Sequence, residues 1–394
     1  MPELLYLDHN ATTPIAPEVR AAMMPWLENE FGNPSSVYSP GRRAADALNS
    51  ARKHVATLVG ARPSEIVFNS CGTEATNTAI LSALAIDPDK RHIITSTVEH
   101  SATIKLCEYL ATRGYEITWL PVDEKGRLDP LLLDEAVTPD TAVVSLLWAN
   151  NETGVLFPVE EIAAITTRRR VPLHLDAVQA AGKVPIDFAS LGVQYASLSA
   201  HKLYAPKGVG ALYVRHGARY TPLLRGSQEE GKRGGTQNVA SIVAFGKAAE
   251  LARKHLLLVA DRVRELRDRF ERNLLTVLPE VRINGSDEMR LPNTSNLTFG
   301  GIDAETALLL FDKEGLCCSA GSACTSGSIN PSHVLTAMGV SRDEARASLR
   351  FSFGRNTSDD EIDRALEIIP RIILKLRADQ PDDGSPVRIA ASHH

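Results

Sequence analysis

Hydrophobic and polar positions along the chain follow two different periods. Residues 42–60 place apolar side chains at helical spacing and end at Gly60, which predicts an amphipathic helix. Residues 141–149, TAVVSLLWA, are apolar without interruption, as in a strand buried on both faces. Further strands are predicted at 64–70, 92–98, 171–177, 195–200 and 208–214, and further helices at 73–85 and 100–114. Strands that alternate with helices predict an α/β fold with a mainly parallel sheet and helices on both faces.

The pattern changes after residue 239. Residues 241–275 are helical throughout, which predicts two helices or one helix with a bend. Strands at 294–300 and 348–354 and helices at 303–314 and 358–377 then predict a smaller α+β unit. We expect a large domain of residues 15–255, a small domain of residues 1–14 and 256–378, and a disordered tail from 379 to 394.

Composition narrows the classes of function. The net charge is −5 and no long basic run is present, which gives no electrostatic support for binding nucleic acid or a membrane surface. No apolar stretch is long enough to span a bilayer, and the acidic N-terminus does not read as a signal peptide, so we expect a cytoplasmic protein. The five cysteines are an odd and sparse set, which favours reduced thiols over a disulfide framework.

Polar residues directly follow five of the predicted strands. In open α/β sheets, ligands bind beyond the carboxyl ends of the strands, so these are the positions available for chemistry. The residues are Gly72, Thr73 and Glu74; Glu99 and His100; Asn150, Asn151 and Glu152; Asp176 and Gln179; and His201 and Lys202. We expect these groups, from five separate strands, to gather at one edge of the sheet.

Each of these positions has a structural interpretation beside the functional one. Gly72 and Thr73 either cap the following helix or bind a phosphate through backbone N–H groups, the helix dipole and the Thr73 hydroxyl. Asp176 is either a turn residue or a buried carboxylate that keeps a ring nitrogen protonated. His100 is either a hydrogen-bonded polar residue or a catalyst. Lys202 follows an apolar strand, where a solvated lysine has no evident reason to stand.

Taken together, the set matches the needs of pyridoxal 5'-phosphate (PLP). A helix start holds the phosphate, a carboxylate keeps the pyridine ring protonated, a flat imidazole stacks on the ring, and a lysine amine forms a Schiff base. A dinucleotide-binding GxGxxG fingerprint and a P-loop are both absent from the sequence.

Longer motifs give a resemblance to a known family. They are YLDHNATTP (6–14), GTEATN (72–77), WANNETG (148–154), HLDAVQAAGKVPID (174–187), SAHKLYAPKGVGALYVR (199–215), RGGTQN (233–238), SAGSACTSGS (319–328) and RFSFGRNT (350–357). In the same order, these resemble motifs of the cysteine desulfurases of the NifS/IscS type, within the class-V aminotransferase-like PLP enzymes. The resemblance implies PLP-dependent fold type I, with a mainly parallel seven-stranded sheet in the large domain.

The resemblance also implies a role for each matching residue. Lys202 would form the Schiff base, Asp176 would pair with the pyridine nitrogen, and His100 would stack on the ring and transfer protons. The other residues implied at the cofactor are Gln179 and Asn151 at the ring hydroxyl, and Gly72, Thr73, Ser199, His201 and, from a second subunit, Thr236 at the phosphate.

Two further residues would act on the substrate. Arg350, with Asn151 nearby, would bind the carboxylate of L-cysteine. Cys324 would attack the substrate sulfur and keep it as a persulfide while L-alanine leaves. Its neighbours are glycine, serine, alanine and threonine, whose low steric barriers suit a thiol that serves two places.

The resemblance implies partners as well. These are a homodimer and an acceptor protein of the NifU/IscU type, which would take the sulfur for iron–sulfur cluster assembly, with nitrogen fixation as one setting.

Other functions remain open from the sequence. Another class-V PLP enzyme, such as an aminotransferase or a selenocysteine lyase, would use the same cofactor residues, although a transaminase has no need for Cys324. A metal or iron–sulfur binding protein would use Cys317, Cys318 and Cys324, but their spacing with no fourth ligand nearby suits a tetrahedral site poorly. No metal site is predicted.

Overall fold

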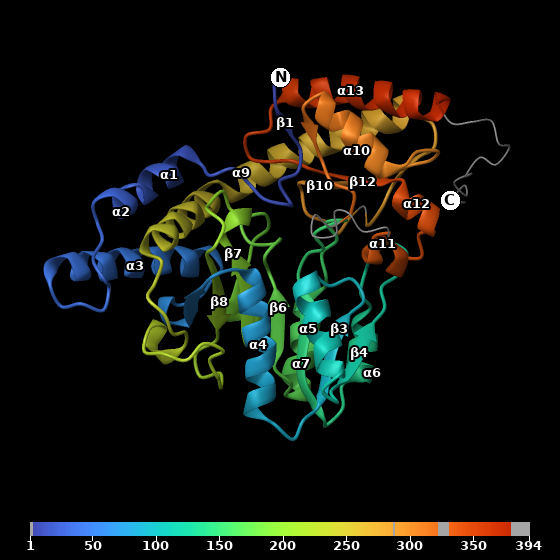
Figure 1. Ribbon diagram of the computed structural model, residues 1–394. Helices are drawn as coiled ribbons and strands as arrows, with labels where there is room; N and C mark the ends of the chain where they lie inside the picture. Colours follow the sequence, from blue (N-terminus) through green and yellow to red (C-terminus); the bar gives the residue numbers. More distant parts are fainter. Residues whose placement is uncertain (1–2, 287, 322–330, 380–394) are drawn as a thin grey trace.

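A computed structural model describes residues 3–286, 288–321 and 331–379. Its centre is a seven-stranded sheet, which confirms the predicted α/β fold (Figure 1). The strands, in order across the sheet, are β2 (Ile66–Asn69), β8 (Gly210–Val214), β7 (Tyr195–Ser199), β6 (Leu173–Asp176), β5 (Thr141–Leu147), β3 (His92–Ser96) and β4 (Glu116–Leu120). Neighbouring strands are parallel except that β8 runs antiparallel to both β7 and β2.

Helices cover both faces of this sheet because alternate strand residues point to opposite sides. In β2, Ile66 and Phe68 join one core, whereas Val67 joins the other. The first core is closed by α3 (Ser39–Leu58), α7 (Val159–Arg169) and the first part of α9 (Val239–Val277). The second core is closed by α4 (Gly72–Ile86) and α5 (Ser101–Ala111). The sheet therefore forms the middle of three layers.

A second group of elements packs around its own core. It contains the antiparallel sheet β12-β10-β9 and a short parallel pair of β1 with β11. The elements are β1 (Leu5–Tyr6), β9 (Val281–Ile283), β10 (Thr294–Phe299), α10 (Ala304–Lys313), β11 (Leu316–Cys317), α11 (His333–Ala337), α12 (Arg342–Arg346), β12 (Ser348–Ser352) and α13 (Asp359–Ala378). Leu5 and Leu7 from the N-terminal segment are buried in this core with Phe351 and Ile369.

The long helix α9 runs from the first group of elements into the second (Figure 1). It is one helix of 39 residues, so the alternative of two separate helices is wrong. The domain boundary expected near residue 255 falls inside it, and the division at that residue stays a prediction. None of the helices in the described part of the chain combines the length and apolar character needed to cross a bilayer.

Most predicted elements are confirmed with ends shifted by one to three residues, but several short ones were missed. These are β4, the helices α1 (Pro17–Met23), α2 (Pro25–Glu28), α6 (Pro130–Ala136) and α8 (Phe188–Leu191), and the strands β1, β9 and β11. β4 lies at the edge of the sheet and is only partly buried, so its sequence EITWL lacks the continuous apolar pattern of the central strands.

His174 lies fully buried in β6 without a charged partner in the described structure. Its ring nitrogens pair with the Ser145 hydroxyl at 2.9 Å and the Ser197 hydroxyl at 2.8 Å. Burial lowers the pKa of His174 from 6.5 to about 3. Between pH 6.5 and about 3, His174 is protonated in the unfolded chain but neutral in the folded chain. The free energy of unfolding therefore falls as the pH drops below 6.5.

We expect this histidine to remove on the order of 2–3 kcal/mol of stability by about pH 4.5. The test compares urea unfolding of the parent and of His174→Gln at about pH 7 and about pH 4.5. The variant should lose less stability on acidification than the parent, because one buried proton acceptor is gone. The exposed His255→Gln serves as the control and should keep the parent's pH dependence. Equal acid sensitivity of the parent and His174→Gln would contradict the assignment.

Candidate functional site

A cavity of about 240 Å³ lies at the carboxyl ends of β2, β3, β5, β6 and β7. These five strands point in the same direction because the antiparallel β8 separates β2 from β7. The cavity brings together ten of the predicted site residues, namely Gly72, Thr73, His100, Asn151, Asp176, Gln179, Ser199, His201, Lys202 and Arg350. The strand-end residues therefore gather as predicted, except that the cavity lining does not include Glu74, Glu99, Asn150 and Glu152.

The start of α4 faces this cavity. The backbone N–H groups of Gly72 and Thr73 make no hydrogen bond to another described group, whereas the Glu74 N–H is capped by the Cys71 sulfur at 3.5 Å. A Cβ atom on Gly72 would lie 2.9 Å from Val178 Cγ2 and 3.5 Å from Ser199 Cβ. A side chain at this position would therefore crowd the space between the helix start and Ser199. The arrangement leaves donors and a positive helix end facing the cavity, which suits an anion.

His201 lies on the same wall as this helix start. Its Nδ1 pairs with the Thr12 hydroxyl at 3.1 Å. Burial, together with the neighbouring charges of Lys202 and Lys207, lowers the pKa of His201 to about 4. The ring is therefore neutral near pH 7, and Nε2 carries a proton if Nδ1 accepts from Thr12.

Asp176 ends β6 and is buried at the floor of the cavity. Its Oδ1 accepts a hydrogen bond from the Val178 N–H at 3.0 Å, and its Oδ2 accepts none from another described residue. Burial raises the pKa of Asp176, and electrostatic interactions with His100 and Lys202 oppose that rise. A buried carboxylate with an oxygen to spare is suited to pair with a protonated ring nitrogen.

His100 caps the start of α5 on another side of the cavity. Its Nδ1 accepts a hydrogen bond from the Ala102 N–H at 3.1 Å, which places the proton of the neutral ring on Nε2. The residue before it, Glu99, is fully buried and turned away from the cavity, toward Ser96 Oγ at 2.6 Å and the Leu147 N–H at 3.1 Å. Burial raises the pKa of Glu99 to about 8, so this carboxyl is protonated near pH 7.

Lys202 ends the short 3₁₀ turn that follows β7 (Ala200–Lys202). Its Nζ donates hydrogen bonds to the backbone oxygens of Asn10 at 2.5 Å and Ala11 at 2.7 Å. Both of these residues line the cavity, and no sequence pattern placed them there. The motif YLDHNATTP marked the segment as unusual, but no spacing linked it to residues almost two hundred positions away.

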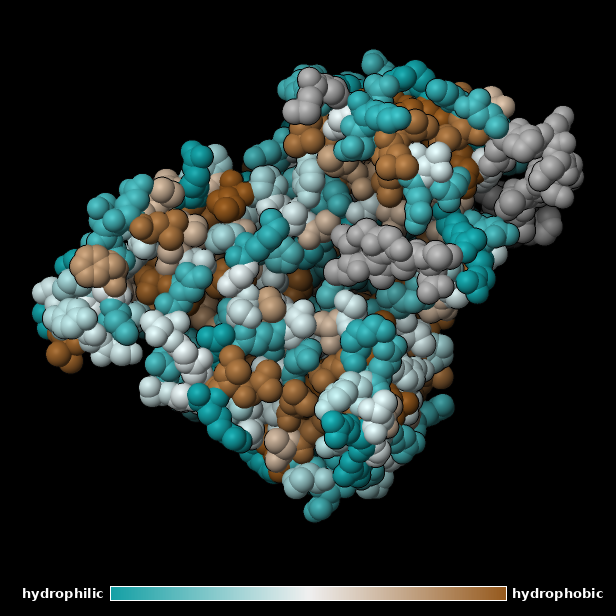
Figure 2. Space-filling model, viewed as in Figure 1, coloured by the Kyte–Doolittle hydropathy of each residue, from teal (hydrophilic) through white to brown (hydrophobic). Residues whose placement is uncertain are grey.

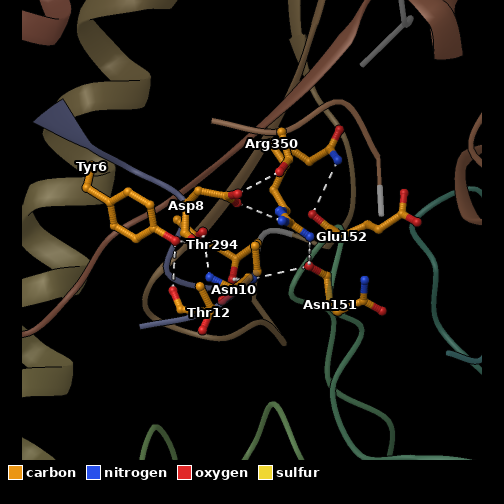
Figure 3. A network of polar contacts seen from close by, with 12 residues as sticks. Tyr6, Asp8, Asn10, Thr12, Asn151, Glu152, Thr294 and Arg350 are labelled. Atoms are coloured by element: carbon orange, nitrogen blue, oxygen red, sulfur yellow. Dashed lines mark hydrogen bonds and ion pairs between the residues drawn. The ribbon is translucent and has the colours of Figure 1, made fainter. Parts of the chain in front are cut away.

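Arg350 enters the cavity from β12, in the second group of elements. Its side chain is 1% exposed. Its two terminal nitrogens donate to Asp8 Oδ1 at 2.7 Å and to the Asn151 backbone oxygen at 3.0 Å (Figure 3). Its Nε has no hydrogen-bond partner in the described structure. Asp8, which the sequence did not single out, therefore fixes a guanidinium that keeps one donor for a ligand.

Asn10 links this arginine network to the rest of the site. Its Nδ2 donates to Thr294 Oγ1 at 2.8 Å and to the Asn151 backbone oxygen at 3.2 Å, so both groups of elements meet at one amide (Figure 3).

Cys324 lies outside the described residues, and its role stays a prediction. The described residues on either side of 322–330 contact the surroundings of the cavity. On one side, Ser319 pairs with the Arg350 backbone and donates to Asp8 Oδ2 at 2.8 Å. On the other side, Ser332 donates to Glu152 Oε2 at 2.5 Å, and His333 Nε2 contacts the Glu99 backbone oxygen at 3.0 Å.

Thr236 does not line the cavity of Lys202 in this chain. It borders another cavity, of about 200 Å³, together with Arg233 and Asn69. Its loop is held to the start of α4 by the ion pair of Arg233 with Glu74 at 2.9 Å. The prediction that Thr236 reaches the phosphate of a second subunit stays a prediction.

The described residues contain no cluster of three or more histidine, cysteine, aspartate or glutamate side chains that is able to hold a metal ion. Cys317 and Cys318 are half-buried free thiols, and burial raises the pKa of both. They therefore resemble packing residues more than nucleophiles.

Comparisons with known proteins agree with this geometry. The family model described as aminotransferase class-V matches residues 5–365. The chain is 50% identical to cysteine desulfurase 2 of Trichormus variabilis over 96% of this chain and 95% of that protein. It is 49% identical to cysteine desulfurase NifS of Azotobacter vinelandii over 96% and 94%.

Solved structures show the same likeness. A NifS-like protein superimposes with a TM-score of 0.89 at 36% identity, covering 95% of this chain and 100% of that one. A structure of a protein called SspA in complex with cysteine superimposes with a TM-score of 0.78 at 34% identity, covering 90% and 99%.

Proposed function

The chain belongs to the class-V aminotransferase family and is a cysteine desulfurase, and from this premise we propose how its own residues carry out the reaction. We infer that PLP binds in the cavity of about 240 Å³ and that L-cysteine binds beside it, next to Arg350. The observation that supports this most is the convergence of Lys202, Asp176, the start of α4 and a buried arginine on one cavity.

The residues present fit PLP as a cofactor. The unpaired N–H groups at Gly72 and Thr73, with the Thr73 and Ser199 hydroxyls and His201, would hold the phosphate. Asp176 Oδ2 would pair with the ring nitrogen, His100 would lie against the ring, and Gln179 and Asn151 would face the ring hydroxyl. When bound, PLP supplies an electron sink for negative charge that develops next to the substrate amino group.

Lys202 and His100 would move the protons. Lys202 Nζ is held by two backbone oxygens and would take the proton from the Cα atom of L-cysteine. His100 Nε2 carries a proton on the cavity side of a ring that Ala102 fixes in place. That position allows it to give a proton to the substrate and to take one from an attacking thiol.

Sulfur transfer would be the task of Cys324. Its thiolate attacks the sulfur of L-cysteine, an S–S bond forms, and the C–S bond breaks with its electron pair going to Cβ. Protonation of Cβ then completes L-alanine, and the sulfur stays on Cys324 as a persulfide. Atoms and electrons balance without an external oxidant, since the C–S bond of the substrate and the S–H bond of the Cys324 thiol are exchanged for one S–S bond and one C–H bond.

Arg350 would bind the carboxylate of L-cysteine through its unpartnered Nε and an adjacent N–H. Arg350→Lys keeps a positive charge but loses the planar pair of donors. We expect KM for L-cysteine to rise by about 10–100-fold with a smaller change in kcat, the range for a lost charge-assisted hydrogen bond. Steady-state kinetics of alanine release would measure it.

The control for this variant is Arg355→Lys, because Arg355 borders a neighbouring cavity and pairs with Glu18. It should keep the parent KM. An unchanged KM in Arg350→Lys would remove Arg350 from substrate binding.

The partners are part of the proposal. A persulfide needs an acceptor, and we propose a NifU/IscU-type scaffold protein, with the sulfur used for iron–sulfur clusters. We also propose a homodimer, in which Thr236 of each chain serves the other chain's site. Exposed hydrophobic side chains on the extension of α1, α2 and the following loop, including Met24, Leu27, Phe31 and Val37, favour a protein contact there (Figure 2).

One assay tests the reaction. The holoenzyme is given L-cysteine and a thiol reductant, and alanine and sulfide are measured with and without an added keto acid. A desulfurase yields alanine and sulfide in equal amounts, and the keto acid makes no difference. Transfer of the amino group to the keto acid without sulfide would favour an aminotransferase instead.

A further inference from the structure

Lys183 makes contacts behind the cavity wall that the reaction described above does not use. It lies four residues after Gln179, half-buried, and borders a second cavity of about 280 Å³ on the other side of Lys202. Its Nζ donates to Gln179 Oε1 at 2.6 Å and to Asn10 Oδ1 at 3.0 Å. Both acceptors are neutral amides, and no carboxylate pairs with this lysine in the described structure. Burying a lysine amine without a carboxylate partner costs free energy of folding. A role in orienting those two amides would give a reason for keeping it there.

The contact with Lys183 decides which end of the Gln179 amide faces the cavity. An amide group has nearly the same shape when it is turned over, so its orientation depends on its partners. Lys183 Nζ donates through its N–H groups, so the Gln179 oxygen is the acceptor of this contact. The Gln179 Nε2 then donates one hydrogen to the Asn10 backbone oxygen at 3.0 Å. Its second hydrogen is left for the cavity, which Gln179 lines.

The same lysine also steadies the acceptor of Lys202. The Asn10 backbone oxygen receives hydrogen bonds from both Gln179 Nε2 and Lys202 Nζ. The side chain of Asn10 is held by Lys183 and by Asn293 Nδ2, each at 3.0 Å. Lys183, Gln179 and Asn10 therefore form one network that ends at the reactive lysine. Burial and the nearby charges of Lys202 and Arg350 lower the pKa of Lys183 well below its usual value.

We infer that Lys183 is a positioning residue that locks the Gln179 amide with its NH₂ group toward the cofactor's ring oxygen. This inference rests on the proposed function, because it assumes that PLP occupies the cavity. Without Lys183, the amide is able to turn its oxygen toward the negatively charged ring oxygen, which replaces an attraction with a repulsion. The Gln179 NH₂ group would also stabilise negative charge on that ring oxygen. The ring oxygen would then hold a proton shared with Lys202 Nζ less tightly.

Lys183→Met tests the inference, because methionine keeps the length of the side chain and removes the donor. We expect the Kd of the apoenzyme for PLP to rise by about 10-fold, the size of one hydrogen bond exchanged for a mismatch. We also expect the pH midpoint of the cofactor's visible absorbance band to rise, because the ring oxygen then holds its shared proton more tightly. Lys183→Arg retains donors and should restore both values most of the way toward those of the parent. Lys254→Met, on the exposed side of α9, removes a charge elsewhere and should leave both unchanged.

A double-mutant cycle separates positioning from a general structural role. In a Gln179→Leu background no amide remains to be oriented, so adding Lys183→Met should change the PLP affinity and the midpoint much less than it does in the parent, because only its contact with Asn10 is then lost. An equal effect of Lys183→Met in both backgrounds would overturn the inference, and so would a Lys183→Met protein that matches the parent in both values. If the parent itself shows no PLP absorbance band, the proposed function fails rather than this inference. Thermal unfolding of the apo forms checks that each variant folds. If Lys183→Met does not fold, Lys183→Arg is compared with the parent instead.

Discussion

Lys202→Ala is expected to lower the rate of alanine formation by about 10²–10⁴-fold or more, the usual contribution of a positioned general base. In the proposed mechanism the Nζ atom has two tasks, since it binds the cofactor covalently and moves the Cα proton. Two backbone oxygens hold that atom at the cavity, and alanine at position 202 removes it. The chain should still fold, because alanine at this position leaves the apolar strand β7 unchanged.

The measurement has two parts. Turnover is followed by alanine release, and a borohydride-reduced sample is digested and analysed by mass spectrometry to locate the cofactor adduct. The parent should carry the adduct on Lys202, and the variant should carry none. Lys207→Ala, at an exposed position five residues away, is the matched control and should keep both the adduct and the activity. An adduct on another lysine of the parent would contradict the whole assignment of the site.

Cys324→Ala is expected to abolish sulfide release, lowering it by about 10³-fold or more, as loss of a nucleophile does in other enzymes. The cofactor's absorbance should remain, because the residues proposed to hold PLP all lie on other parts of the chain. The physical reason is that the C–S bond of the substrate breaks only when a thiolate accepts the sulfur. L-cysteine should therefore still bind and still change the absorbance of the variant.

Two other thiols supply the controls for this variant. Cys317→Ala and Cys318→Ala should each retain sulfide release near the parent rate, because both thiols are half-buried and burial raises their pKa. A Cys324→Ala protein that turns over L-cysteine at the parent rate would show that another group takes the sulfur. Loss of a bound metal in all three variants would favour the metal-binding alternative instead.

The central fold and one wall of the site could be predicted from the sequence. Uninterrupted apolar runs predicted the central strands, because a strand covered on both faces must be apolar at every position. Parallel strands then bring their carboxyl ends to one edge, so the polar residues after β2, β3, β5, β6 and β7 had to gather there. The edge strand β4 was missed because half-buried positions leave a weaker pattern.

The opposite wall could not be predicted in the same way. Asp8, Asn10 and Ala11 contact residues that are 190 or more positions away, such as Lys202 and Arg350. Hydrophobic periodicity reports only on neighbours within one helix or strand, so it carries no information about which distant segments meet. The motif YLDHNATTP marked the N-terminal segment as functional but did not predict which part of the site it contacts.

Local patterns of apolar and polar side chains are enough to predict the type of sheet, the edge at which the chemistry gathers and the residue types available there. Which of those polar residues face the cavity depends on long-range contacts in the folded chain. Asp176 and Gln179 line it, whereas Glu99 turns inward, where burial keeps it protonated. Side-chain direction at the end of a strand depends on contacts from other elements, such as the two hydrogen bonds by which Lys183 holds Gln179 and Asn10. Those contacts exist only once the chain has folded.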